Sequence, residues 1–154
     1  METLKKKGYI FASIFTLSNR LQVIGDKFDK DLTVKQWLLL AGILNSGKKA
    51  PTLTEVAAII GSSRQNVKKM AVALEKAGFV NLEKDENDAR ILRINPTDMC
   101  WEHIKKREKR EIEFLERLFT GFDIQTLDGL CKGISELERN IAEMGDGNDY
   151  EEKD

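Results

Sequence analysis

The chain has 154 residues, of which 41% are hydrophobic and 33% are charged, and its formal net charge at pH 7 is −1. This length suits one domain or a small module with a second lobe, while two cysteines and the lack of a long apolar run exclude a disulfide-rich secreted scaffold and a membrane-spanning protein. The segment after Met144 carries −4 and the remainder therefore +3, so the acidic tail conceals a basic body that is compatible with nucleic acid as a partner.

The first predicted helix spans roughly residues 4–29. Its apolar residues recur at alternating steps of four and three, which places them along one face of a helix. They are Ile10, Ile14, Leu17, Leu21, Ile24 and Phe28. We therefore expect a long helix that packs lengthwise against another helix, and not a targeting segment.

Three shorter helices are predicted to follow. The start of each is indicated by a hydroxyl residue with a glutamate or glutamine three positions later. This is the capping-box pattern, in which each side chain satisfies a free backbone N–H of the first helical turn. The three pairs are Thr33 with Gln36, Thr52 with Glu55, and Ser62 with Gln65. They indicate helices at about 34–45, from 52 to 60, and at 62–78.

The last two of these helices have the spacing of a helix-turn-helix. Ala57 allows a close approach between them, and Gly61 can adopt the positive φ angle that a tight turn requires. Val67 and Met70 are expected to close the small core. The outer face of the second helix keeps Ser63, Arg64, Asn66, Lys68 and Lys69. Hydroxyl, amide and guanidinium groups in the first turns of a helix can contact base edges in a major groove.

A two-stranded hairpin is predicted next, from strands at 79–84 and 90–94. Alternating apolar residues indicate one buried face, and residues 85–88 have turn chemistry. Arg90 lies near the tip, where a guanidinium can enter a narrow minor groove, and Asp88 is close enough to orient it. The acidic residues of the hairpin favour a modest and strongly salt-dependent affinity for DNA.

Two long helices are predicted to complete the chain. Asn95 and Pro96 resemble an N-cap followed by proline at the first helical position, and that helix should run to about Thr120. Asp123 is expected to cap the last helix, whose apolar residues again step by three and four. Because a protomer this small cannot cover all these apolar faces, we expect a two-fold dimer with intertwined terminal helices. The alternative is a bundle formed within one chain.

This order of elements resembles the MarR family of bacterial transcription regulators, and the likeness covers nearly the whole chain apart from the acidic tail. The segments that carry it are Leu32–Trp37, Leu53–Ala57, Ser63–Val67, Leu74–Val80, Asp85 and Asp88–Arg90. Its most specific part is the Asp88-x-Arg90 hairpin, which follows the Leu-Glu-x-x-Gly-Phe exit of the second helix of the helix-turn-helix.

The resemblance implies a mainly α fold with a small β-hairpin: a winged helix-turn-helix whose long N- and C-terminal helices form a dimerisation region. Residues 1–32 and 96–144 would supply the dimerisation helices, residues 33–95 the DNA-binding lobe, and residues 145–154 a disordered acidic tail. The protein would be a cytoplasmic regulator, commonly a repressor, that binds a pseudo-palindromic operator in double-stranded DNA as a homodimer. The residues expected to contact DNA are Ser62, Ser63, Arg64, Gln65, Asn66, Lys68, Lys69, Lys84, Asp88 and Arg90.

A small aromatic or amphipathic effector is a further implied partner, because the family binds such ligands between the dimer region and the DNA-binding lobe. Phe11, Phe15, Trp37 and Trp101 could line that cleft. The alternative is that these four aromatic residues belong to the ordinary core.

Enzyme classes are disfavoured, because the one histidine, His103, has no companions that form a catalytic set and no phosphate-binding glycine loop is present. Cys100 and His103 lie one helical turn apart, but a core cysteine beside a surface histidine explains them better than a metal site. Neither a metal nor another cofactor is expected. Two further interpretations remain open: a winged helix that binds protein instead of DNA, and a regulator that responds to oxidation of Cys100 or Cys131.

Overall fold

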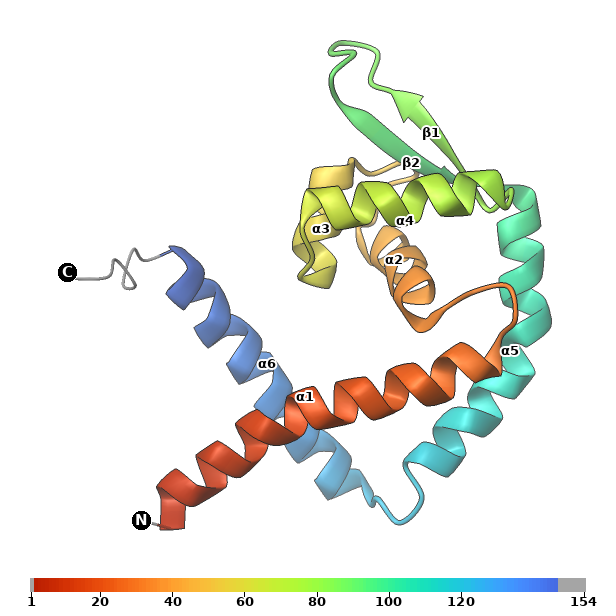
Figure 1. Ribbon diagram of the computed structural model, residues 1–154. Helices are drawn as coiled ribbons and strands as arrows, with labels where there is room; N and C mark the ends of the chain where they lie inside the picture. Colours follow the sequence, from red (N-terminus) through yellow and green to blue (C-terminus); the bar gives the residue numbers. More distant parts are fainter. Residues whose placement is uncertain (1, 147–154) are drawn as a thin grey trace. The chain divides into compact units, whose positions relative to one another are not determined.

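The computed structural model describes residues 2–146, and within this range the fold is mainly helical with one antiparallel hairpin, as predicted (Figure 1). The chain divides into two compact units, Met1–Lys106 and Arg107–Asp154. None of the described helices is both long enough and apolar enough to cross a membrane. In chain order, the elements are α1 (Glu2–Phe28), α2 (Val34–Asn45), α3 (Leu53–Ile60), α4 (Arg64–Lys76), β1 (Val80–Lys84), β2 (Leu92–Pro96), α5 (Asp98–Leu118) and α6 (Ile124–Asp146).

The core of the first unit lies between α2, α3, α4, the base of the hairpin and the first turns of α5. Its most enclosed side chains are at most 1% exposed and include Leu39, Val56, Val67, Leu74, Ile94 and Cys100. Glycine at position 42 lets α2 approach α3, because a Cβ atom there would lie 2.6 Å from Cγ2 of Ile60. The close packing of these three helices fixes the position of the helix-turn-helix.

Two of the three predicted capping boxes are present. Thr33 accepts a hydrogen bond from the backbone of Gln36, whose side chain accepts one from the backbone of Thr33. Thr52 and Glu55 make the same reciprocal pair at α3, with N···O distances of 3.1 and 2.9 Å. Each box satisfies two N–H groups that a helix start otherwise leaves without a partner.

Replacing Thr52 by alanine is expected to lower the free energy of unfolding by about 1 kcal/mol, because one N–H of the first turn of α3 loses its acceptor. Thr52→Ser keeps the hydroxyl and should stay close to wild type. Urea unfolding followed by circular dichroism measures both variants. Equal losses in the two variants would show that the methyl group of Thr52, and not its cap, carries the effect.

Two details of the sequence prediction were wrong. The N-cap of α4 is Ser63 and not Ser62, so no Ser62–Gln65 box forms and the helix begins at Arg64. Asn95 and Pro96 extend β2, where they pair with Asn81 and Val80, instead of opening a helix. The Thr97 hydroxyl accepts from the Cys100 amide at 3.2 Å and so takes over the capping role at α5.

The end of the chain also differs from expectation, because α6 continues to Asp146 and so includes two residues of the segment predicted to be disordered. The rest of that segment, residues 147–154, lies outside the described residues. Asp123 caps α6 as predicted, and its carboxylate accepts from the Thr126 amide at 2.8 Å.

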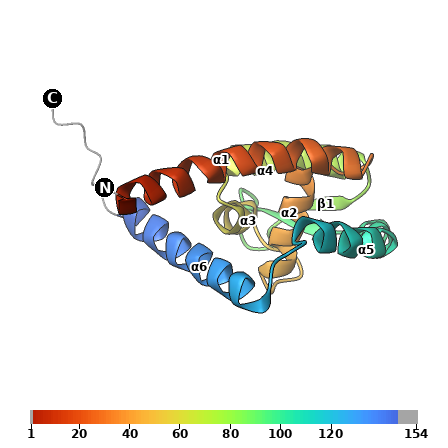
Figure 2. The ribbon, with the colours of Figure 1, turned by 90° about the horizontal axis from the view of Figure 1, so that it is seen from below.

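The long helices expose much of their apolar surface. In the first unit, α1 is one continuous helix (Figure 2), and none of its residues is buried. Ile10, Ile14, Leu17 and Ile24 are each about half exposed. In the second unit, α6 exposes Leu130, Ile134, Leu137, Ile141 and Met144. These are residues of the predicted seams, and the assignment of residues 1–32 and 96–144 to dimerisation remains a prediction.

Candidate nucleic-acid interface

The turn between α3 and α4 sets the direction in which α4 leaves the core. Gly61 ends α3 with a φ of 67°, in the left-handed region that glycine adopts without a steric penalty. The amide of Ser62 donates to the carbonyl of Ala57 at 3.0 Å, and the hydroxyl of Ser63 accepts from the amide of Asn66 at 3.1 Å. The first turn of α4 is therefore fixed by local hydrogen bonds.

Helix α4 is divided between a buried face and a cationic face. Val67, Ala71 and Leu74 are buried in the core. The predicted DNA contacts on this helix all lie outside the core: Ser63, Arg64, Gln65, Asn66, Lys68 and Lys69 are exposed and Ser62 is half-buried. The sequence therefore brings amide, guanidinium and ammonium groups together on the solvent side of the first two turns. We call this set of exposed residues, Arg64 to Asn66 with Lys68 and Lys69, the cationic face.

The hairpin extends beside α4 as a wing (Figure 1). One carboxylate organises its tip. Asp85 accepts hydrogen bonds from the amides of Asn87 and Asp88 at 3.1 and 3.2 Å, and from Nε of Arg93 at 2.7 Å. Its side chain is only 13% exposed. Arg93 also donates to the carbonyl of Ala50 at 3.1 Å, so the wing is attached to the loop before α3.

Asp88 and Arg90 form the predicted pair at the tip. Nε and one terminal nitrogen of Arg90 donate to the two carboxylate oxygens of Asp88 at 3.0 and 2.9 Å, while the Arg90 amide donates to the same carboxylate at 3.0 Å. Hydrogen bonding to Arg90 lowers the pKa of Asp88 and raises that of Arg90. The Arg90 side chain is nevertheless 91% exposed, so its guanidinium is oriented and accessible at once.

The wing tip should remain ordered well into the acid range. Hydrogen bonds, first from Arg93 and then from the Asn87 amide, hold the pKa of Asp85 below its ordinary value of 3.8. The carboxylate therefore contributes its full stabilisation above that value, and the contribution is lost as the pH falls through the lower pKa of the folded state. The amide resonances of Asn87 and Asp88, followed by NMR from about pH 5 to about pH 2, should titrate with a midpoint below 3.8. Asp85→Asn should abolish this titration, whereas a midpoint at or above 3.8 would contradict the assigned role.

Lys84 and Arg93, both on the wing, have environments that differ from each other. Lys84 is exposed at the end of β1, where an ammonium group can reach a phosphate. Arg93 is held by Asp85 and Ala50, and its guanidinium has a structural role in the wing. The sequence alone did not predict this network. The pairing of an aspartate after one strand with an arginine on the other was the available clue.

The structure places the four aromatic residues proposed for an effector site on α1, α2 and α5. Phe11 and Phe15 make an edge-to-face contact with ring centroids 5.2 Å apart, and both are exposed on α1. Trp37 is half-buried on α2, and Trp101 is 41% exposed. None of the four lines the pocket beside His103 or the pocket along α1 between Tyr9 and Arg20. Their role in ligand binding remains a prediction.

Cys100 and His103 have different surroundings although one helical turn separates them. Cys100 is completely buried in the core, and desolvation raises the pKa of its thiol to about 11. His103 is half-buried rather than on the open surface, and its Nε2 lies 2.8 Å from the carboxylate of Asp29. Cys100 is therefore a core residue, as predicted, whereas the prediction of a surface histidine was wrong.

Comparisons with known proteins agree with this winged-helix geometry. The model of the MarR family matches residues 30–91, which contain α2, the helix-turn-helix and most of the wing. No curated protein matches the sequence.

Solved structures of the same fold cover most of the chain. A MarR protein from Peptoclostridium difficile DA00132 is 24% identical, with 86% of each chain covered and a TM-score of 0.77. A MarR/EmrR family transcriptional regulator from Acinetobacter sp. ADP1 is 18% identical, with 89% of this chain and 97% of that chain covered and a TM-score of 0.76. FabT of Streptococcus pneumoniae, solved in complex with DNA, is 15% identical, with 90% of this chain and 99% of that chain covered and a TM-score of 0.63.

Proposed function

We propose that this chain, whose winged-helix lobe belongs to the MarR family, is a transcription regulator that binds double-stranded DNA in a sequence-specific manner. The observation that carries the proposal is the cationic face of α4. Arg64 and Asn66 lie in its first turn, where side chains can make bidentate hydrogen bonds to guanine and adenine edges. Lys68 and Lys69 follow on the exposed side and suit phosphate contacts.

The wing is proposed to contact DNA beside the major groove. Arg90 is exposed at the tip and held by Asp88 in one orientation, which suits insertion into a narrow and electronegative minor groove. Lys84 at the end of β1 is proposed to contact a phosphate. Ser62, Ser63 and Gln65 are the remaining residues proposed to contact DNA, and the Ser63 hydroxyl already serves as the N-cap of α4.

A homodimer is proposed to present two such lobes to a pseudo-palindromic operator. The exposed apolar residues of α1 and α6 supply a surface that a second copy of the chain would bury. A two-fold axis would place the two α4 helices in successive major grooves, about one helical turn of DNA apart.

Repression, with release by a small-molecule effector, is the regulatory mode that we propose. In a protein of the same fold, BpsR of Bordetella bronchiseptica, 6-hydroxynicotinic acid regulates DNA binding. A ligand could act here only if it bound one spacing of the two α4 helices more tightly than the other. Phe11, Phe15, Trp37 and Trp101 remain the proposed contacts for an aromatic or amphipathic ligand.

Selection of bound fragments from random duplex DNA, followed by sequencing, tests the proposed function directly. The expected product is a sequence motif with two inverted half-sites whose centres are about 10 base pairs apart. An asymmetric motif would contradict the dimer. Failure to retain any duplex at low ionic strength would contradict DNA binding itself, because the electrostatic part of the affinity is largest there.

The two other interpretations have less support. A winged helix that binds protein would be expected to expose apolar or acidic residues on α4, whereas this one exposes the cationic face. Oxidation of Cys100 is disfavoured by its burial and by the raised pKa of its thiol, since the thiolate is the reactive form. Cys131 is exposed on α6 and is the thiol on which a redox response would depend.

A further inference from the structure

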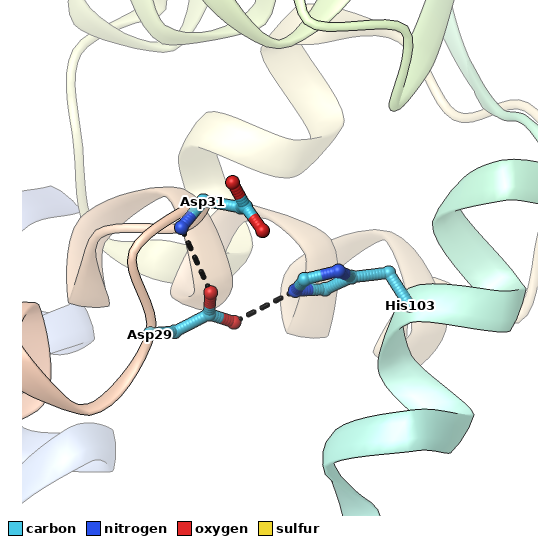
Figure 3. A group of neighbouring side chains, drawn as sticks. All are labelled: Asp29, Asp31 and His103. Carbon is cyan, nitrogen blue, oxygen red and sulfur yellow. Dashed lines mark hydrogen bonds and ion pairs between the residues drawn. The ribbon is translucent and has the colours of Figure 1, made fainter.

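Three side chains from two separate segments meet in the first unit, away from the cationic face. Asp29 and Asp31 belong to the loop between α1 and α2, and His103 belongs to the second turn of α5 (Figure 3). One nitrogen or oxygen atom from each of the three lies within 4.8 Å of the other two. The sequence separation between Asp29 and His103 is 74 residues, so the fold, and not local structure, creates this group.

The group is held in place by its surroundings. Nε2 of His103 lies 2.8 Å from Oδ2 of Asp29, and Oδ1 of Asp29 accepts from the Asp31 amide at 2.9 Å. The Asp29 side chain is only 8% exposed. The imidazole also contacts the ring of Phe79 edge to face, with centroids 5.2 Å apart. Two of the three side chains are thus fixed before any ligand arrives, which reduces the entropy lost on binding.

The contact between Asp29 and His103 does not explain why the carboxylate of Asp31 lies beside them. The carboxylate of Asp31 points toward the other two groups, yet it makes no hydrogen bond to any residue in the described part of the chain (Figure 3). Two carboxylates at such close range repel each other unless a cation lies between them.

The group opens onto a pocket that a solvated ion can enter. Asp31, Glu102 and His103 line this pocket, which has a volume of about 360 Å³. Lys106 also lines it and opposes a cation, but the three carboxylates nearby outweigh this single charge. The open side leaves room for water molecules to complete a coordination shell.

We propose that Asp29, Asp31 and His103 bind a divalent first-row transition-metal cation, of which Zn²⁺ is the best probe. Imidazole nitrogen and carboxylate oxygen both bind Zn²⁺, at about 2.0–2.2 Å, and three protein ligands with an open position are a common arrangement. The metal would take the place of the hydrogen bond between His103 and Asp29. In the sequence, His103 lies one helical turn from Cys100, whereas the fold places it beside two aspartates.

Calorimetric titration of the full chain with Zn²⁺ tests the proposal without DNA. The wild type should bind one equivalent per chain, and Asp31→Asn should weaken binding at least about tenfold, since even outer-shell partners of metal ligands are worth that much. Asp31 is exposed and its carboxylate supports no hydrogen bond of the fold, so this variant should fold normally. His103→Gln should lose binding further. Asp98→Asn is the matched control, because it removes an exposed carboxylate from the first turn of α5, outside the group.

A second metal separates this site from the exposed Cys131, which could also bind Zn²⁺. The absorption spectrum of the Co²⁺ complex should lack a thiolate charge-transfer band in the near ultraviolet, and its visible d–d bands should change in Asp31→Asn. The proposal is overturned if the wild type binds no Zn²⁺, if Asp31→Asn binds as well as wild type, if Asp98→Asn loses as much affinity, or if the thiolate band appears.

Discussion

Replacing Arg64 by alanine is expected to weaken binding to the selected operator by about 1–3 kcal/mol, or roughly 5- to 150-fold. Arg64 is the first residue of α4 and is exposed, directly after the Ser63 cap that fixes the helix start. A guanidinium at this position can donate two parallel hydrogen bonds to guanine O6 and N7. Because those bonds exist only with the correct base, their loss should lower specific affinity more than non-specific affinity.

Lys69→Ala is the matched control for Arg64→Ala. Both residues are exposed cations on the same helix, and each substitution removes one positive charge. A phosphate contact carries no sequence information, so Lys69→Ala should weaken binding to operator and to unrelated duplex by similar factors and reduce the salt slope by about one.

Gel shifts on both duplexes, at matched salt concentrations, give the ratio of specific to non-specific affinity for each variant. Arg64→Ala should lower this ratio, and Lys69→Ala should leave it nearly unchanged. Unchanged operator binding in Arg64→Ala would remove the assignment of Arg64 as a base contact. A similar fall in the ratio for both variants would mean that the two residues do not divide into base and phosphate contacts.

The helix-turn-helix could be predicted in detail because its determinants are local. The Thr52–Glu55 box, the positive φ of Gly61 and the exposure of Arg64 all follow from residues a few positions apart. The error at Ser62 has an equally local cause. Two adjacent serines can each cap a helix, and the hydrogen bond from the Ser62 amide to the Ala57 carbonyl assigns the first of them to the turn.

The start of α5 was predicted less well because a distant contact decides it. Asn95 and Pro96 have good local chemistry for a helix start, but the register of β2 against β1 keeps them in the strand. The Thr97 hydroxyl also donates to the carbonyl of Gly78 at 2.6 Å, which joins the helix start to the end of α4. Tertiary pairing of this kind outweighs a local capping preference.

The networks that the sequence analysis missed connect residues far apart in the chain. Arg93 reaches the carbonyl of Ala50 across 43 positions, and His103 reaches Asp29 across 74. No periodicity or spacing rule links such positions, because their proximity depends on how the elements pack. The exposed apolar residues of α1 and α6, by contrast, were predicted from their steps of three and four.

Replacing Ile134 by glutamate is expected to convert the proposed dimer into monomers and to lower operator affinity by more than about 100-fold. Ile134 lies midway along α6 and is 48% exposed in the single chain. In a dimer that buries this face, each copy would place an unpaired carboxylate in an apolar interface, at a cost of several kcal/mol per ion. Loss of the dimer then removes the second half-site contact, which contributes to affinity as an intramolecular binding event.

Ser135→Glu is the control, because it introduces the same side chain at the next position, which points away from the row formed by Leu130, Ile134 and Leu137. It should remain dimeric and bind the operator nearly as well as wild type. Sedimentation velocity at micromolar concentration reports the assembly of each variant, and circular dichroism confirms that α6 is still helical. If the wild type sediments as a monomer, or if Ile134→Glu remains a dimer, α6 does not form the interface. Operator binding that survives in a monomeric Ile134→Glu variant would instead show that one lobe suffices for recognition.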